Sequence, residues 1–154
     1  MRFLVQRVNE ASVNVNHQVV GQIHKGFLVF IGVSQRDIQN DAKVIAEKMV
    51  KKLLGLRIFE DENGKTNLDL RSVSGGLLLV SQFTLYADCK KGNRPSFIDA
   101  GAPDKANEIY EYIIGLCRQQ IQTVETGVFG ADMKVQLSND GPFTILLDSD
   151  ELFH

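Results

Sequence analysis

Two short apolar runs constrain this chain more than any other feature of its sequence. GFLVFIGV at residues 26–33 and LLLV at residues 77–80 contain no polar side chain. Runs of this length, rich in branched and aromatic residues, are typical of strands that are buried on both faces. We therefore expect both runs in the interior of a sheet, and we place the longer segment LLLVSQFTLY (residues 77–86) at the sheet centre.

Each run is followed along the chain by an apolar stripe with the spacing of an amphipathic helix. Asp37 or Asn40 is expected to cap the first helix, Gly55 ends it, and Pro103 suits the first position of the second helix. The first stripe consists of Ile38, Ala42, Ile45, Met49 and Leu53, and the second of Ala106, Ile109, Tyr110, Ile113, Leu116 and Cys117.

The remaining segments read as strands joined by turns. Alternating or β-branched segments occur near both ends of the chain, and turn residues follow at 16–18 and 61–64. No linker, repeat or low-complexity segment divides the chain, so we expect one α/β domain over residues 1–154, with a mostly antiparallel sheet and two main helices. The further strand segments are RFLVQRV, ASVNVN, QVVGQI, LRIFE, ADMKVQLSN and PFTILLD.

Composition excludes several classes of protein. Hydrophobic residues make up 44% of the 154 residues, charged residues make up 23%, and the net charge is −2, which gives no global attraction to nucleic acid or to an anionic membrane. Two cysteines cannot form a disulfide framework, and the apolar stretch at the N-terminus, MRFLVQRVNE, is too short for a signal peptide. No apolar run is long enough for a membrane span. We expect a cytoplasmic protein with no membrane partner.

The usual sets of catalytic side chains are hard to assemble from this sequence. The three histidines (17, 24 and 154) lack metal-ligand spacing, and neither GxGxxG nor GxxxxGK[ST] is present. Cys117 lies on a helical apolar stripe and is expected in the core, whereas Cys89 reads as an exposed thiol. The acidic residues at 148, 150 and 151 read as a solvated tail. We therefore expect no metal site, and neither a dinucleotide site nor a P-loop is predicted.

Three polar segments remain as candidates for function. Ser81–Leu85 places hydroxyl and amide groups at the end of an apolar run, although Thr84 by pattern alone reads as a β-branched strand residue. Asn139–Thr144 contains Gly-Pro between two expected strands, which predicts a turn with unpaired carbonyl groups, and the base rate favours a trans peptide there. The stretch 87–101 reads as a long exposed loop that carries the basic residues Lys90, Lys91 and Arg94.

SQFTLYAD and NDGPFT together resemble the paired signatures of the D-aminoacyl-tRNA deacylase (D-tyrosyl-tRNA deacylase) family. QRVNEASV, KLLGLRIFEDENGKTNLDL, KKGNRPSF and TGVFGADMKVQLSNDGP resemble the family pattern in order and spacing, so that the resemblance covers essentially the whole chain. Two departures are Phe143, where valine is more usual, and Asn93, where arginine is frequent.

The resemblance implies a cytoplasmic homodimeric hydrolase with a barrel-like sheet, which uses no metal or cofactor. It would cleave the ester between a D-amino acid and tRNA, would reject L-aminoacyl-tRNA, and would have glycyl-tRNA as a second candidate substrate. The resemblance assigns catalysis to Ser81, Gln82, Phe83 and Thr84, with oxyanion-binding N–H groups near Phe83 and Thr84. It also implies a cis Gly141–Pro142 peptide that enters this pocket from the partner subunit. We further predict substrate contacts from Phe129 and Met133 and tRNA contacts from Lys90, Lys91 and Arg94.

Two questions stay open at this level. The attack on the ester is assisted either by Thr84 as nucleophile or by the terminal ribose 2′-OH of the substrate, and we favour the second because no side chain has a motif-supported place as a base for Thr84. The alternative to an enzyme is a non-catalytic module of the same fold that binds tRNA or its aminoacyl end.

Overall fold

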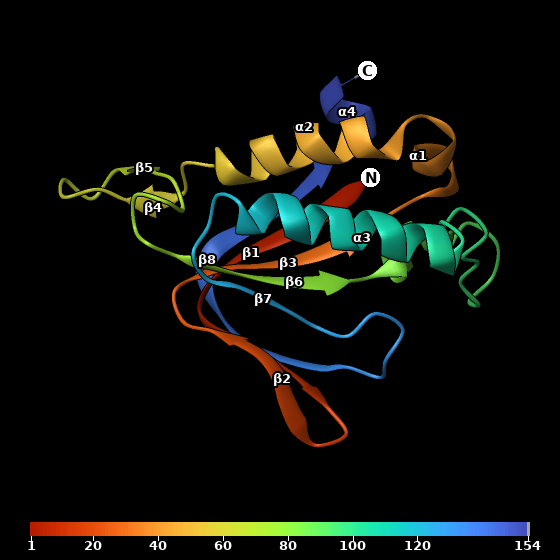
Figure 1. Cartoon of the computed structure of the whole chain (residues 1–154), viewed down its shortest axis with the longest axis horizontal. Coiled ribbons are helices and arrows are strands. Elements are labelled where there is room, and N and C mark those ends of the chain that lie inside the picture. Colours follow the sequence, from red (N-terminus) through yellow and green to blue (C-terminus); the bar gives the residue numbers. More distant parts are fainter. Residues whose placement is uncertain (154) are drawn as a thin grey trace.

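The computed structural model describes residues 1–153 and contains a curled six-stranded sheet with helices packed on one face, together with a small two-stranded sheet (Figure 1). Its strand order is β2-β1-β3-β6-β7, and β8 pairs with the other edge of β1. The ends of the sheet approach each other, because a Cβ added at Gly21 in β2 would overlap the carbonyl oxygen of Thr126 in β7. The strands are β1 (Arg2–Val15), β2 (Gln18–Ile23), β3 (Gly26–Gly32), β6 (Gly76–Ser81), β7 (Val124–Thr126) and β8 (Lys134–Asp148).

The pairing confirms the mostly antiparallel α/β arrangement with a barrel-like sheet. β1 is antiparallel to β2, β3 and β8, whereas β3–β6 and β6–β7 are parallel. Both apolar runs are buried on both faces, as expected: Phe27 and Leu77 contact the core beneath the helices, and Leu28 and Leu78 contact a second core inside the curl. β6 lies between β3 and β7, in the interior of the sheet.

The two expected helices are present, and the first of them is divided. α2 (Ala42–Leu54) and α3 (Pro103–Arg118) bury their apolar stripes against the sheet, and Pro103 occupies the first turn of α3. The expected cap of the first helix was wrong. Ser34 caps the short α1 (Gln35–Gln39) in a capping box with Asp37, and Asp41, with φ 58°, is the N-cap of α2. Asn40 is the C-cap of α1, so the expected helix is interrupted between Asn40 and Asp41.

Three strand expectations were also wrong. LRIFE contributes only β4 (Phe59–Glu60), which pairs with β5 (Thr66–Leu68) across the expected turn. The strand through residues 77–86 stops at Ser81, because residues 83–86 form the 3₁₀ helix η1 (Phe83–Tyr86). The two C-terminal strands are one strand, β8, and Gly141-Pro142 lies within it. α4 (Ser149–Phe153) follows, and no helix within residues 1–153 is long and apolar enough to span a membrane.

Candidate functional site

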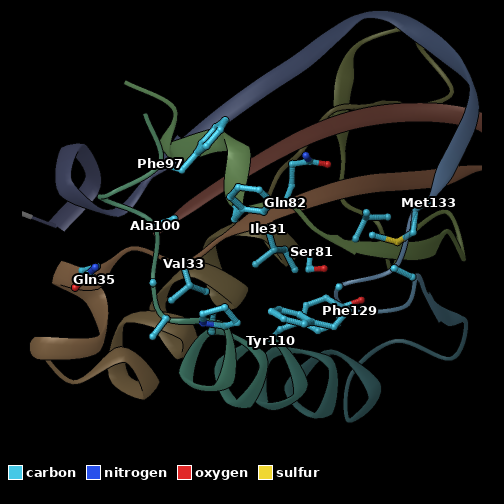
Figure 2. Close-up of a pocket in the computed structure, with 18 of the residues that line it drawn as sticks. Ile31, Val33, Gln35, Ser81, Gln82, Phe97, Ala100, Tyr110, Phe129 and Met133 are labelled. Carbon is cyan, nitrogen blue, oxygen red and sulfur yellow. The ribbon is translucent and has the colours of Figure 1, made fainter. Parts of the chain in front are cut away.

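A cavity of about 710 Å³ opens where the parallel strands β3 and β6 end (Figure 2). Beyond these ends the chain diverges, because β3 leads into α1 and β6 leads into η1. Helix α3 and the segment 129–133 form the opposite wall. The lining is largely apolar and includes Ile31, Val33, Phe97, Tyr110, Phe129 and Met133. Such an apolar concavity with few polar groups is typical of a small-molecule binding site.

The structure brings the predicted residues Ser81, Gln82, Phe83, Phe129 and Met133 together around this cavity. Figure 2 shows the first two beside the end of β3, and the last two on the opposite wall. Ser81 is the last residue of β6, which explains why a hydroxyl follows the apolar run directly. The segment that was predicted from its motif therefore forms one wall, although it is a helical turn and not a strand.

Tyr110 forms part of the cavity floor and is fixed there by a hydrogen bond. Its hydroxyl donates to the carbonyl oxygen of Leu79 at 2.8 Å, and its ring lies 6.0 Å from the ring of Phe129. Burial raises the pKa of the Tyr110 hydroxyl far above its usual range, so the group stays protonated as a donor. The floor is thus neutral and rigid.

The turn η1 begins beside the cavity lining, at Phe83, and Thr84 is not itself a lining residue. Phe83 and Thr84 are the first residues of the turn, so their N–H groups have no acceptor within it, and no side chain caps η1. The side-chain amide of Gln82 donates to the hydroxyl of Thr84. Thr84 is exposed and lies outside any strand, so its interpretation as a strand residue was wrong.

The second predicted motif forms a bulge in β8. Val8 of β1 pairs with Asn139, and Gln6 pairs with Thr144, so residues 140–143 lie opposite Arg7 alone. The peptide bond between residues 141 and 142 is cis, as the resemblance implied, and both residues are exposed. Neither of them lines the cavity of its own chain.

Arg7 holds this bulge in place and is 5% exposed. Its Nε lies 3.0 Å from the Asp140 carboxylate and donates to the Asp140 carbonyl at 3.2 Å. The two terminal nitrogens donate to the carbonyls of Ile58 (2.6 Å) and Gly141 (3.4 Å), and the guanidinium stacks 4.5 Å from the Phe143 ring centroid. The prediction of unpaired carbonyls at this turn was therefore wrong for Asp140 and Gly141.

The side chain of Asn139 forms hydrogen bonds that connect the two ends of the bulge. Its side-chain amide donates to the carbonyl of Arg7 at 3.0 Å and to the carbonyl of Phe143 at 3.1 Å. These two bonds tie the residue before the bulge to the residue that ends it. The backbone of the exposed turn is thus fixed at both ends.

The predicted basic residues lie on an exposed loop next to the cavity. Lys90, Lys91 and Arg94 are exposed between Asp88 and Ser96, whose backbone groups bond to each other at 2.8 and 2.9 Å. Immediately afterwards the chain returns to the cavity rim, where the ring of Phe97 packs edge-on against Phe83 at 5.1 Å. The loop therefore extends outward from the rim.

The other candidates fall outside the site. Cys117 is buried, and burial raises the pKa of its thiol to about 12, whereas Cys89 is exposed. His17 and His24 are exposed, and His154 lies outside the described residues. Within residues 1–153, no three His, Cys, Asp or Glu side chains are grouped in a way that could hold a metal ion.

Sequence reasoning missed Arg7 and misplaced Asp148. Arg7 follows Phe3 and Val5 on the buried face of the alternating pattern of β1, and this position is the signal that could have identified it. Asp148 is not part of a solvated tail, because it is 7% exposed and its carboxylate pairs with Arg2 at 2.7 Å. Both errors concern charged groups that pair with residues more than 130 positions away in sequence.

Comparisons with known proteins agree with this geometry. The family model described as D-Tyr-tRNA(Tyr) deacylase matches residues 4–148. Proteins named D-aminoacyl-tRNA deacylase from Thermosipho melanesiensis and Clostridium novyi are 52% and 50% identical, and each match covers 99% of this chain and 100% of the relative.

Two solved structures are also similar. One, described as c-Myc DNA Unwinding Element Binding Protein, is 38% identical with a TM-score of 0.88, and the match covers 96% of this chain and 98% of that one. A probable eukaryotic D-amino acid tRNA deacylase is 20% identical with a TM-score of 0.82, and the match covers 95% and 97% of the two chains; this likeness shows the fold alone.

Replacing Arg7 with methionine should destabilise the protein by about 1–3 kcal/mol, because buried carbonyl groups lose their donors. The measurement is urea unfolding. Arg36→Met is the matched control, since Arg36 is 64% exposed and its pair with Asp150 should contribute less than about 1 kcal/mol. Equal losses in the two variants would contradict a special role for the buried guanidinium.

Proposed function

The chain belongs to the D-Tyr-tRNA(Tyr) deacylase family, and on this premise we propose that it hydrolyses the ester bond of D-aminoacyl-tRNA, releasing a D-amino acid and tRNA. The observation that carries the proposal is that the match to deacylases extends over 99% of the chain. It includes both the cavity wall at Ser81–Thr84 and the exposed turn at Gly141-Pro142. The non-catalytic alternative is not favoured, because the full-length relatives are named as enzymes.

The active unit in this proposal is a homodimer in which each cavity receives the Gly141-Pro142 turn of the other subunit. Two observations support it. The turn is exposed and does not line its own cavity. The cavity rim carries apolar side chains that water would otherwise contact, since Phe83 is 57% and Ile98 is 74% exposed. A two-fold axis would place the same contact twice and would complete two identical sites.

Discrimination between mirror-image substrates follows from shape in this arrangement. The carbonyl oxygens of Asp140 and Gly141 are held by Arg7, and each keeps a second lone pair that can accept a bond from the α-amino group of the substrate. If the amino group and the ester are both fixed, an L side chain collides with this rigid main chain, whereas a D side chain points away from it. Glycine lacks the colliding group, which makes glycyl-tRNA a second substrate in this proposal.

The chemical step needs stabilisation of the developing oxyanion and activation of the attacking group. The N–H groups of Phe83 and Thr84 at the start of η1 are the proposed oxyanion donors, and preorganised donors of this kind contribute roughly 3–4 kcal/mol. In the described part of the chain the Thr84 hydroxyl bonds to the Gln82 amide, which is a donor and cannot act as a base. This supports activation by the 2′-OH of the terminal ribose rather than by Thr84.

The remaining predicted residues would hold the RNA end of the substrate. Phe129 and Met133 line the cavity wall opposite η1, where they would contact the terminal adenosine. Lys90, Lys91 and Arg94 are exposed on the loop that leaves the rim, and they would contact phosphates of the acceptor stem. Because the net charge is −2, this local group of cations is the proposed electrostatic contact.

Incubation of the purified protein with D-Tyr-tRNA and L-Tyr-tRNA tests the proposed activity directly. We expect release of tyrosine from the D substrate only, because the L side chain would collide with the main chain of the turn. Release is measured from labelled aminoacyl-tRNA, with the same substrates in buffer as the control for spontaneous hydrolysis. Cleavage of neither substrate would favour the binding module, and equal cleavage of both would refute discrimination by shape.

Thr84→Ala should retain kcat within about tenfold of the unsubstituted protein, since the hydroxyl has no base to activate it. Single-turnover deacylation of D-Tyr-tRNA provides the measurement. Thr66→Ala, at an exposed threonine of β5, is the control. A loss of three or more orders of magnitude in the Thr84 variant alone would restore the nucleophile hypothesis.

Mixed dimers test whether the site is shared. Gly141→Phe should fold normally, because a Cβ there approaches only the Asn139 side chain at 3.8 Å, yet its ring would fill the partner's cavity. Ala102→Trp should block the cavity of its own chain. Each variant alone should be inactive, whereas an equal mixture that has exchanged subunits should recover about a quarter of the activity, since half of the dimers then hold one intact site. No recovery after verified exchange would place the whole site within one chain.

A further inference from the structure

We propose that Arg2 is a positioning residue that fixes the turn η1 of the active site against the end of β8 through Asp148. This inference rests on the proposed function, because it assigns Arg2 to the support of the proposed oxyanion donors.

The turn η1 has few anchors of its own. None of its four residues is buried, and no side chain caps it. Its flanking backbone bonds are Gln82 N–H to the Ile31 carbonyl at 2.7 Å, Leu85 N–H to the Gln82 carbonyl at 3.3 Å, and Ala87 N–H to the Thr84 carbonyl at 3.1 Å. Only the first of these reaches the sheet. A short 3₁₀ turn with so few bonds needs external contacts to hold a single conformation.

Arg2 provides two such contacts from the start of β1. One terminal nitrogen donates to the carbonyl oxygen of Leu85 at 2.8 Å, and the guanidinium carbon lies 4.6 Å from the centroid of the Tyr86 ring. The same guanidinium uses its Nε to donate to Asp148 at 2.7 Å. A planar fork of donors can make these contacts at once, which a lysine ammonium on a flexible stem cannot do as well.

The Asp148 end of this connection is rigid. The Asp148 side chain is 8% exposed, and its second oxygen accepts the N–H of Asp150 at 3.0 Å. Burial alone would raise the pKa of the Asp148 carboxyl, but the hydrogen bond from Arg2 and the Asp150 N–H outweigh it and lower the pKa overall. The carboxylate is therefore ionised at neutral pH and holds the guanidinium at a fixed position.

The turn also lies directly over the residue that pairs with Arg2. Gly32 of β3 is the β1–β3 register partner of Arg2, and a Cβ at Gly32 would lie 3.1 Å from the Leu85 Cβ and 3.3 Å from the Tyr86 ring. The strand β3 thus packs against η1, and Arg2 contacts the last two residues of η1. Without Arg2, the turn keeps this support and the packing of Phe83 against Phe97, but its last two residues lose the contacts of the guanidinium.

A donor that is misplaced by a fraction of an ångström stabilises the transition state less, whereas it changes ground-state binding little. Loss of the restraint should therefore lower kcat rather than raise KM. Displacements near 1 Å can cost about 100-fold in rate, so we expect a fall in kcat of about 10- to 100-fold for Arg2→Met.

The test compares Arg2→Met, Arg2→Lys and Asp148→Asn with Arg36→Met, which removes an exposed arginine that pairs with Asp150. Kinetics with D-Tyr-tRNA should show the fall in kcat for Arg2→Met with KM within about threefold, partial recovery in Arg2→Lys and an intermediate loss in Asp148→Asn. Amide hydrogen exchange over residues 83–87 should be faster in Arg2→Met and unchanged in Arg36→Met. If Arg2→Met fails to fold, Arg2→Lys and Asp148→Asn carry the same comparison.

An unchanged kcat, or unchanged exchange over residues 83–87, in folded variants would overturn the role of Arg2. A fall in kcat that only follows the folded fraction, measured by unfolding at the assay temperature, would also overturn it. If the unsubstituted protein hydrolyses neither D- nor L-Tyr-tRNA, the proposed function fails instead. Hydrogen exchange then still decides whether Arg2 restrains η1.

Discussion

The shape of β8 depends on the hydrogen bonds that the buried guanidinium of Arg7 makes. Four residues of β8 lie opposite this one residue of β1, so the ladder cannot satisfy their carbonyl groups. Arg7 supplies the missing donors to Asp140 and Gly141, and a further donor to Ile58 in the chain before β4. The Asp140 carboxylate and the rings of Phe59 and Phe143 offset the cost of burying the charge.

The bulge and the cavity are consequences of how the sheet is paired. Among residues 1–153, β8 pairs only with β1, so its other edge has no neighbouring strand there. A bulge in such an edge interrupts the regular row of N–H and C=O groups that would otherwise pair with another strand. At the parallel end of the same sheet, β3 and β6 lead into different elements, and their divergence opens the cavity at the carboxyl ends of the strands. Ligands commonly bind where parallel strands diverge in this way.

Local patterns in the sequence were sufficient for the main elements of the fold. The unbroken runs identified β3 and β6, and the helical stripes identified α2 and α3. Burial determines the spacing of apolar residues along a strand or helix, and this spacing is visible in the sequence. The end of β6 was missed because residues 82–86 have strand-like side chains, whereas their conformation is set by tertiary contacts to Gly32 and Arg2. The two site segments were identified from their polar residues beside apolar strands, but their roles came only through the resemblance, since no period or spacing encodes a bulge.

When a pocket has no conventional base, the chemistry that it can perform depends on the positions of its main-chain atoms. Asp132 is the carboxylate among the lining residues of the described chain, and its side chain is 86% exposed and pairs with Lys134. An apolar wall strengthens hydrogen bonds from main-chain donors because little water competes for the same acceptor. The same wall cannot correct a misplaced donor, since the described lining residues include no cationic side chain that could take over its role. The long-range polar contacts of Arg2 with η1, and those of Arg7 and Asn139 with the bulge, therefore matter for where these main-chain atoms lie.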